Sequence, residues 1–257
     1  MKLPPDWDKP EEGNDALCRL FSREEYDGGV TKLPYRLFIP KTGNGKVPLV
    51  LYMHGADAVG RDNELPLSMH DIGTMFAKET WQEEHPCFIA APQYGPSQYW
   101  SHELLRDGVQ AMVHELIFTY PSIDINRLYL YGYSAGGVGV MRMLKEYPGI
   151  YAGAVSICGA TGREDLEKLL NTPLWLVHAA DDTIVRTSYK DSGFASVHLG
   201  SRDIMDRLRD RGGELKYTEY PAGYMQEKYG VNPHCSWVAV SDPKNRVFAE
   251  WLFEKSR

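Results

Sequence analysis

The sequence has few of the features that mark metal-binding, disulfide-bonded or membrane-spanning proteins. Its 257 residues include only four cysteines, which lie far apart and form no C-x-x-C pair or Cys/His cluster. This pattern indicates neither a disulfide framework nor a metal site, and we expect no cofactor and no metal. No apolar run approaches the roughly 18 residues that a membrane-spanning helix needs.

Excess charge of either sign is also scarce. The net charge of −7 is modest, and no basic stripe interleaved with aromatic residues is present. These features disfavour nucleic acid and anionic membranes as partners. Because the first residues lack the apolar segment of a signal peptide, we expect a cytoplasmic protein; a secreted protein whose signal peptide has been removed is the alternative. The sequence leaves the oligomeric state open.

What the sequence does contain is an alternation of strand and helix patterns without repeats or linkers. Because strands separated by helices form parallel sheets, we expect an α/β fold with a mostly parallel central sheet of about eight strands and helices on both faces. We expect one domain over 1–257, in which 1–40 supply antiparallel strands. Strands are predicted at 17–21, 34–39, 49–53, 87–91, 128–131, 152–157, 174–178 and 215–220, and helices at 69–84, 103–120 and 137–146.

One apolar run leads directly into a G-x-S-x-G motif. Residues 128–140 read L-Y-L-Y-G-Y-S-A-G-G-V-G-V. The motif is typical of a nucleophilic serine on a sharp turn between a strand and a helix, where only small neighbours let the backbones pass closely. Gly132 and Gly136 are those neighbours, and Ser134 is the candidate nucleophile. The pentapeptide alone also fits an ordinary glycine-rich connection.

An acid and a histidine are available downstream of Ser134. Proteins with this turn carry serine, acid and histidine in that chain order. Asp181 and Asp182 both follow a predicted buried strand, where catalytic groups collect at the carboxyl ends of parallel strands. Of the two histidines after them, His198 lies at the entry to a predicted helix, whereas His234 lies in a polar loop after the last strand. We therefore favour His234 as the base.

A backbone site for a developing negative charge is also predicted. The apolar run 48–53 ends in His54-Gly55-Ala56, and an H-G-x turn at this point is a usual source of one N–H donor. The first helical residue after the serine, Ala135, supplies the other. We expect the N–H groups of Ala56 and Ala135 to form an oxyanion hole, and we interpret His54 as a packed residue that shapes the loop.

These motifs together resemble the α/β-hydrolases of the phospholipase/carboxylesterase-like group, especially bacterial esterases known as predicted peptidases. The resemblance covers about 35–251. It implies the α/β-hydrolase fold and a catalytic triad of Ser134, Asp182 and His234. The matching segments, beyond the serine motif, are 54–63, 91–93, 99–100, 123–127 and 234–237.

The resemblance also separates the two acids. The family's acid motif is similar to H-G-x-x-D-x-x-V-P, and aligning His178 and Val185 with it places the catalytic acid at Asp182. Asp57 departs from the family pattern because it stands where glycine is usual. It puts a carboxylate beside the expected oxyanion hole, and we expect it to point away. Two further departures, Ala179 and Arg186, affect loop shape only.

The connection 159–172 is too short for the cap that lipases and many esterases insert there. The walls of a pocket must then come from loops, and we take Tyr99, Trp100 and Trp237 as candidate substrate-binding residues. Tyr94 and Tyr224 are further aromatic candidates. For each of them a place in the core is the ordinary alternative, because aromatic side chains more often fill cores than bind ligands.

The sequence thus predicts a cofactor-free serine carboxylesterase that works through an acyl-enzyme. Its partner would be a small-molecule ester with a short-chain or aromatic group, such as a feruloyl or acetylated carbohydrate ester. A serine peptidase of the same fold and a catalytically silent binding module are the alternatives. The sequence does not identify the natural ester.

Overall fold

The computed structural model describes residues 15–29, 31–41 and 45–257, and residues 1–14 of the expected domain lie outside this part. The described strands are β1 (Ser22–Asp27), β2 (Lys32–Phe38), β3 (Val47–Met53), β4 (Phe88–Pro92), β5 (Ile123–Tyr133), β6 (Gly153–Ile157), β7 (Thr161–Gly162), β8 (Leu174–Ala179), β9 (His198–Leu199) and β10 (Leu215–Tyr220). The α-helices are α1 (Asp15–Cys18), α2 (Leu65–Ser68), α3 (Glu79–Glu84), α4 (Glu103–Thr119), α5 (Ala135–Glu146), α6 (Ser201–Leu208), α7 (Tyr224–Tyr229), α8 (Trp237–Ser241) and α9 (Val247–Phe253). The 3₁₀ helices are η2 (Ala56–Ala58), η3 (Asp71–Gly73), η4 (Met75–Ala77) and η5 (Leu166–Asn171).

A mostly parallel sheet forms the centre of the molecule, as the sequence predicts. It has 8 strands in the order β1-β2-β4-β3-β5-β6-β8-β10. The run from β4 to β10 is parallel throughout, whereas β2 pairs antiparallel with both β4 and β1. Parallel strands place all their carboxyl ends at one edge of the sheet, so the loops after β3, β5 and β8 can meet there.

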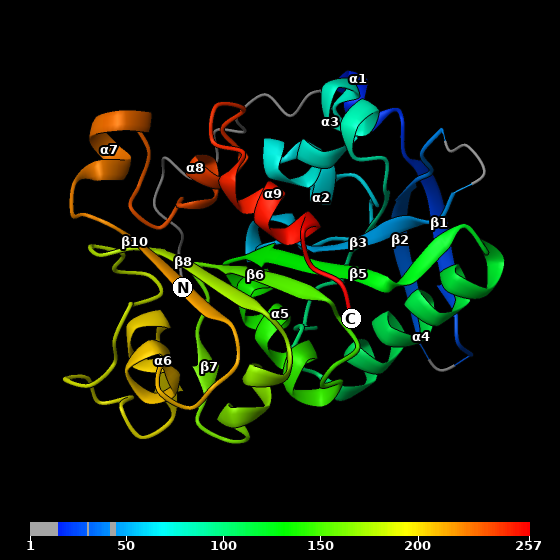
Figure 1. The fold of residues 1–257 in the computed structure, drawn as a ribbon. Coiled ribbons are helices and arrows are strands. Elements are labelled where there is room, and N and C mark those ends of the chain that lie inside the picture. The colour runs from blue at the N-terminus through cyan, green and yellow to red at the C-terminus, as the bar shows by residue number, and fades with distance from the viewer. Residues whose placement is uncertain (1–14, 30, 42–44) are drawn as a thin grey trace.

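Helices cover both faces of the sheet (Figure 1). In this view α4, α5 and α6 lie below the sheet, and α2, α3, α8 and α9 lie above it. The alternation along β3 shows how the strands serve two cores: Leu49 and Leu51 pack on the α4–α5 side, whereas Val50 and Tyr52 pack on the other. Because both faces are covered, every residue of β3 is buried, and the strand reads as a continuous apolar run.

Two predicted elements were wrong or incomplete. The expected strand at 17–21 is wrong, because α1 ends at Cys18 and the strand begins at Ser22. The sequence S-R-E-E-Y-D of β1 is polar because its side chains are exposed or half-buried at the edge of the sheet, which removes the apolar signal. The predicted helix at 69–84 is broken into η3, η4 and α3. The backbone leaves helical geometry at His70 (φ −149°, ψ 145°) and again at Lys78 (φ −59°, ψ 135°), so no continuous helix spans the segment.

The connection between β6 and β8 contains only β7 and η5. It adds no separate layer over the carboxyl edge of the sheet, in keeping with its length in the sequence. Within the described residues, no helix has both the length and the apolar character needed to cross a membrane.

The turn between β5 and α5 depends on two glycines. A Cβ at Gly132 would lie 2.5 Å from the carbonyl oxygen of Met53, and one at Gly136 would overlap the same oxygen more severely. This close approach lets the loop after β3 lie against the start of α5. Larger residues would force the loop and the turn apart.

We expect Gly136→Ala to lower the melting temperature by several degrees, because the added methyl group meets backbone atoms that cannot rotate away. Gly193→Ala is the matched control, since a Cβ there has nothing within 4 Å. Thermal unfolding of both variants checks the argument. Equal melting temperatures for the two variants would contradict it.

Candidate active site

Ser134 occupies a strained position at the carboxyl end of β5. Its backbone angles are φ 53° and ψ −118°, a conformation that costs a non-glycine residue on the order of 1–3 kcal/mol. Its N–H donates to the carbonyl of Ile157 on the neighbouring strand, which helps to hold the turn. The side chain is 8% exposed, so the hydroxyl sits at the floor of the carboxyl edge with limited access to solvent.

Asp182 lies just after β8 and is fixed by its own loop. Its Oδ1 accepts hydrogen bonds from the N–H groups of Ile184 (2.8 Å) and Val185 (3.1 Å). Its Oδ2 lies 3.2 Å from Nε2 of His178, a nitrogen that also lies 2.8 Å from the carbonyl oxygen of Val185. The carboxylate is therefore buried but fully hydrogen-bonded, which is the condition for keeping a charge in the interior.

His234 joins the serine and the acid. Its Nδ1 donates to Oδ2 of Asp182 at 2.6 Å, and the hydroxyl of Ser134 donates to its Nε2 at 2.9 Å. The residue is fully buried, and its backbone N–H donates to Oδ1 of Asn232 at 2.9 Å. A carboxylate can only accept, so this arrangement requires the proton on Nδ1 and leaves Nε2 unprotonated, as a base for the serine proton must be.

The surroundings of Asp182 favour its charged form. Burial on its own raises the pKa of a carboxyl group. Here the hydrogen bonds from His178 and His234, together with their charges when protonated, outweigh burial and hold the pKa of Asp182 well below its ordinary value. The acid therefore stays ionised over the neutral pH range, where it can orient and stabilise the imidazole.

The other predicted acid has a different partner. Oδ2 of Asp181 accepts from the N–H of Gly223 at 2.8 Å, which ties the end of β8 to the turn before α7. His198 does not contact Ser134 in these interactions either. It lies in β9, which pairs with β7, and its ring contacts Tyr189 and Phe194. Of the alternatives left by the sequence, the structure thus brings Asp182 and His234 to Ser134.

The two predicted oxyanion donors both begin helices. Ala56 is the first residue of η2, and Ala135 is the first residue of α5. The first N–H groups of a helix have no partner within it, which is the property that the predicted oxyanion donors need. The contact between Gly136 and the backbone of Met53 and His54 holds the two helix starts against each other.

His54 is a packing residue, as its place in the sequence suggests. Its ring is buried, stacks on Tyr94 at 4.8 Å and meets Trp100 edge-on at 5.1 Å. Its Nδ1 donates to the carbonyl of Gly55 at 2.6 Å. Burial lowers the pKa of His54 to about 4, so the residue is neutral at physiological pH and shapes the loop without adding charge.

The predicted substrate-binding role of Trp100 needs correction. This side chain is only 1% exposed, and its indole N–H donates to the carbonyl of His54 at 3.0 Å. It therefore supports the loop after β3 from within the core and offers no exposed face for stacking. Tyr94 is buried beside it, 4.7 Å away.

The other aromatic candidates differ from one another. Tyr99 is 60% exposed and stays available to a ligand. Trp237 is buried, lies edge-on to the ring of His234 at 5.7 Å, and packs on Tyr133 at 4.4 Å. The indole of Trp237 therefore packs against the imidazole of His234 and supports it. Its large ring near the motif H-C-S-W suggested a pocket wall, but sequence alone cannot tell a wall from a support.

Sequence reasoning gave no role to His70, which contacts Asp57 beside the oxyanion loop. Its Nε2 lies 2.7 Å from Oδ2 of Asp57. No local motif signals this pair, because the two residues are 13 positions apart and meet only through tertiary packing. The described residues contain no group of three or more His, Cys, Asp or Glu side chains arranged to hold a metal ion.

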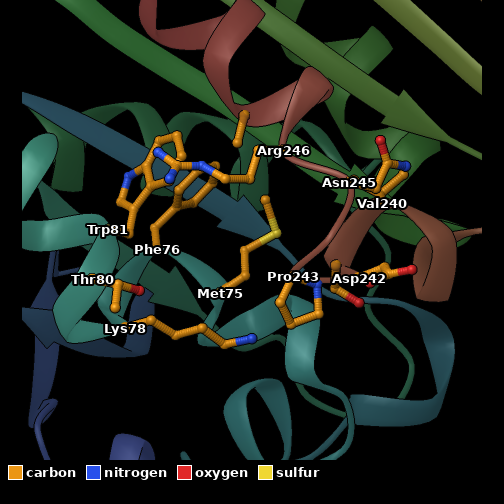
Figure 2. A pocket seen from close by; sticks show the side chains of 12 residues that line it. Met75, Phe76, Lys78, Thr80, Trp81, Val240, Asp242, Pro243, Asn245 and Arg246 are labelled. Atoms are coloured by element: carbon orange, nitrogen blue, oxygen red, sulfur yellow. The ribbon is translucent and has the colours of Figure 1, made fainter.

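Figure 2 shows a cleft on another part of the molecule, between η4 and α3 on one side and the α8–α9 segment on the other. Phe76, Trp81 and Val240 contribute apolar surface to it, and Arg246 lies over the ring of Trp81 at 5.0 Å. Its lining includes none of Ser134, Asp182 and His234. A hollow alone therefore does not identify the reactive centre of this protein.

A central parallel sheet with a strained serine turn and a Ser–His–Asp hydrogen-bond chain defines the α/β-hydrolase fold. Comparison with solved structures agrees. The chain is 34% identical to a thermostable esterase, with a TM-score of 0.83 over 94% of this chain. It spans 64% of the length of that esterase.

More distant structures share the fold alone. An acylaminoacyl peptidase from Pyrococcus horikoshii is 15% identical with a TM-score of 0.64, over 90% of this chain and 41% of the peptidase. Est1E from Butyrivibrio proteoclasticus is 14% identical with a TM-score of 0.57, over 90% of this chain and 96% of Est1E. No family model and no curated protein matches the chain. The chain therefore has the α/β-hydrolase fold.

The different contacts of the paired acids generate a test. Asp182→Asn should slow the reaction of Ser134 with a fluorophosphonate probe by at least 10²-fold, because an amide at this position favours the wrong tautomer of His234. Asp181→Asn should change the rate by less than about threefold, since its side-chain oxygen can still accept from Gly223. Stopped labelling followed by gel fluorescence measures both rates. Equal losses in the two variants would move the acid to Asp181 or to neither residue.

Proposed function

We propose that this protein is a serine hydrolase that cleaves carboxylic esters through an acyl-enzyme. The observation that carries the proposal is the hydrogen-bond chain from Ser134 through His234 to Asp182, on a strained turn beside two helix starts. The 34% identity to a thermostable esterase favours esters over other substrates. We place the protein with the carboxylesterase-like members of the superfamily.

The first half of the reaction uses all three side chains. The oxygen of Ser134 attacks the ester carbonyl while Nε2 of His234 takes its proton, and Asp182 stabilises the imidazolium that forms. The negative charge that develops on the carbonyl oxygen would be held by the N–H groups of Ala56 and Ala135. Removing one such donor typically costs about 10²–10³ in kcat.

The second half reverses the roles. His234 protonates the departing alcohol, which leaves the acyl group on Ser134. Water then gives its proton to His234 and attacks the acyl carbonyl, and the tetrahedral intermediate breaks down to release the acid and the free serine. All of these steps use residues of the chain itself.

The surroundings of Ser134 favour small or flat acyl groups. The connection between β6 and β8 contributes only β7 and η5, so it supplies no cover for a long alkyl chain. On the loop after Asp182, a second cleft is lined by Tyr189, Phe194 and His198. Phe194 is 61% exposed, an unusual setting for a large apolar ring, and it could stack on an aromatic group. Thr183 and Ile184, which follow Asp182 in the sequence, also line this cleft, whereas Ser134, Asp182 and His234 do not.

A peptidase of the same fold is the second hydrolase candidate. The acylaminoacyl peptidase structures support it only at the level of the fold, because their identity to this chain is 15–16%. Amide cleavage also needs stronger protonation of the leaving group. A chromogenic peptide assayed beside the esters separates the two candidates.

Ser134→Ala should abolish ester hydrolysis without unfolding the protein, which also separates an enzyme from a catalytically silent binding module. Ser241→Ala is the matched control, because Ser241 is also 8% exposed and its hydroxyl donates to the carbonyl of Trp237. Turnover of p-nitrophenyl acetate and the circular dichroism spectrum are measured for both. Undiminished turnover by folded Ser134→Ala would overturn the proposal.

Acyl-chain length should affect the rate in a definite direction. Without a cover, each methylene beyond a short chain stays in water and loses the roughly 0.8 kcal/mol that its burial would give. We expect kcat/KM for p-nitrophenyl esters to peak between acetate and butyrate, with no activation at an oil–water interface. A rate that rises steadily from butyrate to palmitate would reveal an acyl tunnel and contradict this account of the site.

A further inference from the structure

Asp57 is a buried carboxylate in the loop that carries the proposed oxyanion donor. Both of its oxygens have partners: the hydroxyl of Tyr133 donates to Oδ1 at 2.6 Å, and Nε2–H of His70 donates to Oδ2 at 2.7 Å. The side chains of Asp57 and His70 are only 6% and 8% exposed. The proposed reaction gives none of these three residues a direct task.

The partners of Asp57 belong to two other parts of the site. Tyr133 is the last residue of β5 and directly precedes Ser134. His70 lies immediately before η3, on a segment that packs against α8. Asp57 itself follows Ala56, so one carboxylate fastens the oxyanion loop both to the serine turn and to the segment beneath the histidine loop.

The packing around these groups leaves little freedom. A Cβ at Gly55 would collide with the ring of Tyr133, so that ring lies directly against the loop backbone. His70 meets the ring of Tyr133 edge-on at 5.5 Å and contacts Trp237 at 5.0 Å. Trp237 in turn lies against His234. The Asp57 contacts thus connect the loop of Ala56, the turn of Ser134 and the ring of His234.

The charge of Asp57 would oppose an oxyanion nearby if nothing balanced it, since like charges repel strongly in a site with little water. The hydroxyl of Tyr133 and Nε2–H of His70 offset this charge, because each donates a hydrogen bond to one carboxylate oxygen. Burial raises the pKa of Asp57, but the hydrogen bond and charge of His70 and the hydrogen bond of Tyr133 together hold it below its ordinary value. Asp57 is thus an ionised carboxylate with one oxygen hydrogen-bonded to Tyr133 and the other to His70.

We propose that Asp57 and His70 are positioning residues that fix the N–H of Ala56 relative to Ser134, with the hydroxyl of Tyr133 as the third member of the clamp. The proposal rests on the proposed esterase function. It predicts that the clamp matters when charge develops on the carbonyl oxygen, since a displacement of about 1 Å in such a donor can cost on the order of 10²-fold in rate. It should matter little for binding of the uncharged ester.

The test compares Asp57→Asn, His70→Leu and His70→Gln with the wild-type enzyme on p-nitrophenyl acetate. In Asp57→Asn, the side-chain NH₂ group would face either Tyr133 or His70, so one of the two hydrogen bonds is lost. His70→Leu removes the donor to Oδ2. Each should lower kcat at least tenfold while KM stays within about twofold. Gln at position 70 keeps an N–H donor, so His70→Gln should recover kcat to within about threefold of wild type.

Phenylboronic acid supplies a readout that a purely structural role would not move. It forms a tetrahedral adduct with a reactive serine and places an oxygen where the oxyanion would be. Its inhibition constant should rise by the same factor as kcat falls in Asp57→Asn and His70→Leu. The double variant Asp57→Asn/His70→Leu should lose no more kcat than the more impaired single variant, because both substitutions break the same hydrogen-bonded contact.

Glu214→Gln is the matched control, because Glu214 also accepts from two side chains, Trp251 and Lys255, at the amino end of β10. It should lower stability without changing kcat. If His70→Leu proves insoluble, Tyr133→Phe keeps the ring packing and should still lower kcat by about three- to tenfold. The proposal is overturned if the folded Asp57 and His70 variants keep wild-type kcat, or if kcat and KM change in the same way as in Glu214→Gln.

The two levels of the argument fail separately. A wild-type protein without esterase activity, or with activity that survives Ser134→Ala, refutes the proposed function. An active wild type that depends on Ser134 but tolerates loss of the Asp57–His70 contact refutes the clamp alone.

Discussion

The close approach between the serine turn and the loop after β3 is the constraint on which the site depends. Met53 ends its strand with a carbonyl that lies where a side chain at Gly132 or Gly136 would be. Because these positions have no side chain, two helix starts can lie beside one serine. Ser134, between these two glycines, has a positive φ, which the surrounding sheet must stabilise. The strained turn and the two helix starts therefore meet at one close backbone contact.

Around this turn, specific donors hold two buried carboxylates, Asp182 and Asp57. Asp182 receives two backbone N–H groups and contacts from two histidines. Asp57 receives a tyrosine hydroxyl and a histidine. The two carboxylates flank the serine from different loops, and each is paired with an imidazole. Such pairing fixes the positions of the charges, and fixed charges and dipoles are how a preorganised site lowers the cost of developing charge.

The sequence predicted the parts of the fold that are recorded in local patterns. Buried strands such as β3 and β8 are continuous apolar runs, and α4 shows a clear apolar face, so their positions could be read directly. The edge strand β1 could not, because solvent exposure on the sheet edge removes the apolar pattern. The breaks in the predicted helix at 69–84 fall at His70 and Lys78, where neither proline nor glycine marks them in the sequence.

The same distinction applies to the site. Ser134, Asp182 and His234 follow motifs in a fixed chain order, and the structure places them within hydrogen-bonding distance. The role of Trp100 was misjudged, because a tryptophan in a loop reads alike whether it lines a pocket or supports a backbone. The partnership of Asp57 with His70 was not predicted either, since it exists only once two separate loops are packed together. The sequence therefore predicts well the chain order of the proposed catalytic residues. It predicts poorly which other side chains position them.

The central claim is that Ser134 carries the acyl group during turnover. The most direct measurement is mass spectrometry of protein quenched in acid within milliseconds of mixing with excess p-nitrophenyl butyrate, followed by peptide mapping. The account predicts one butyryl group per chain, found on the peptide that contains Ser134, with a burst of p-nitrophenol of matching size. Hydrolysis that proceeds with no acylated species, or with the acyl group on a different residue, would contradict it.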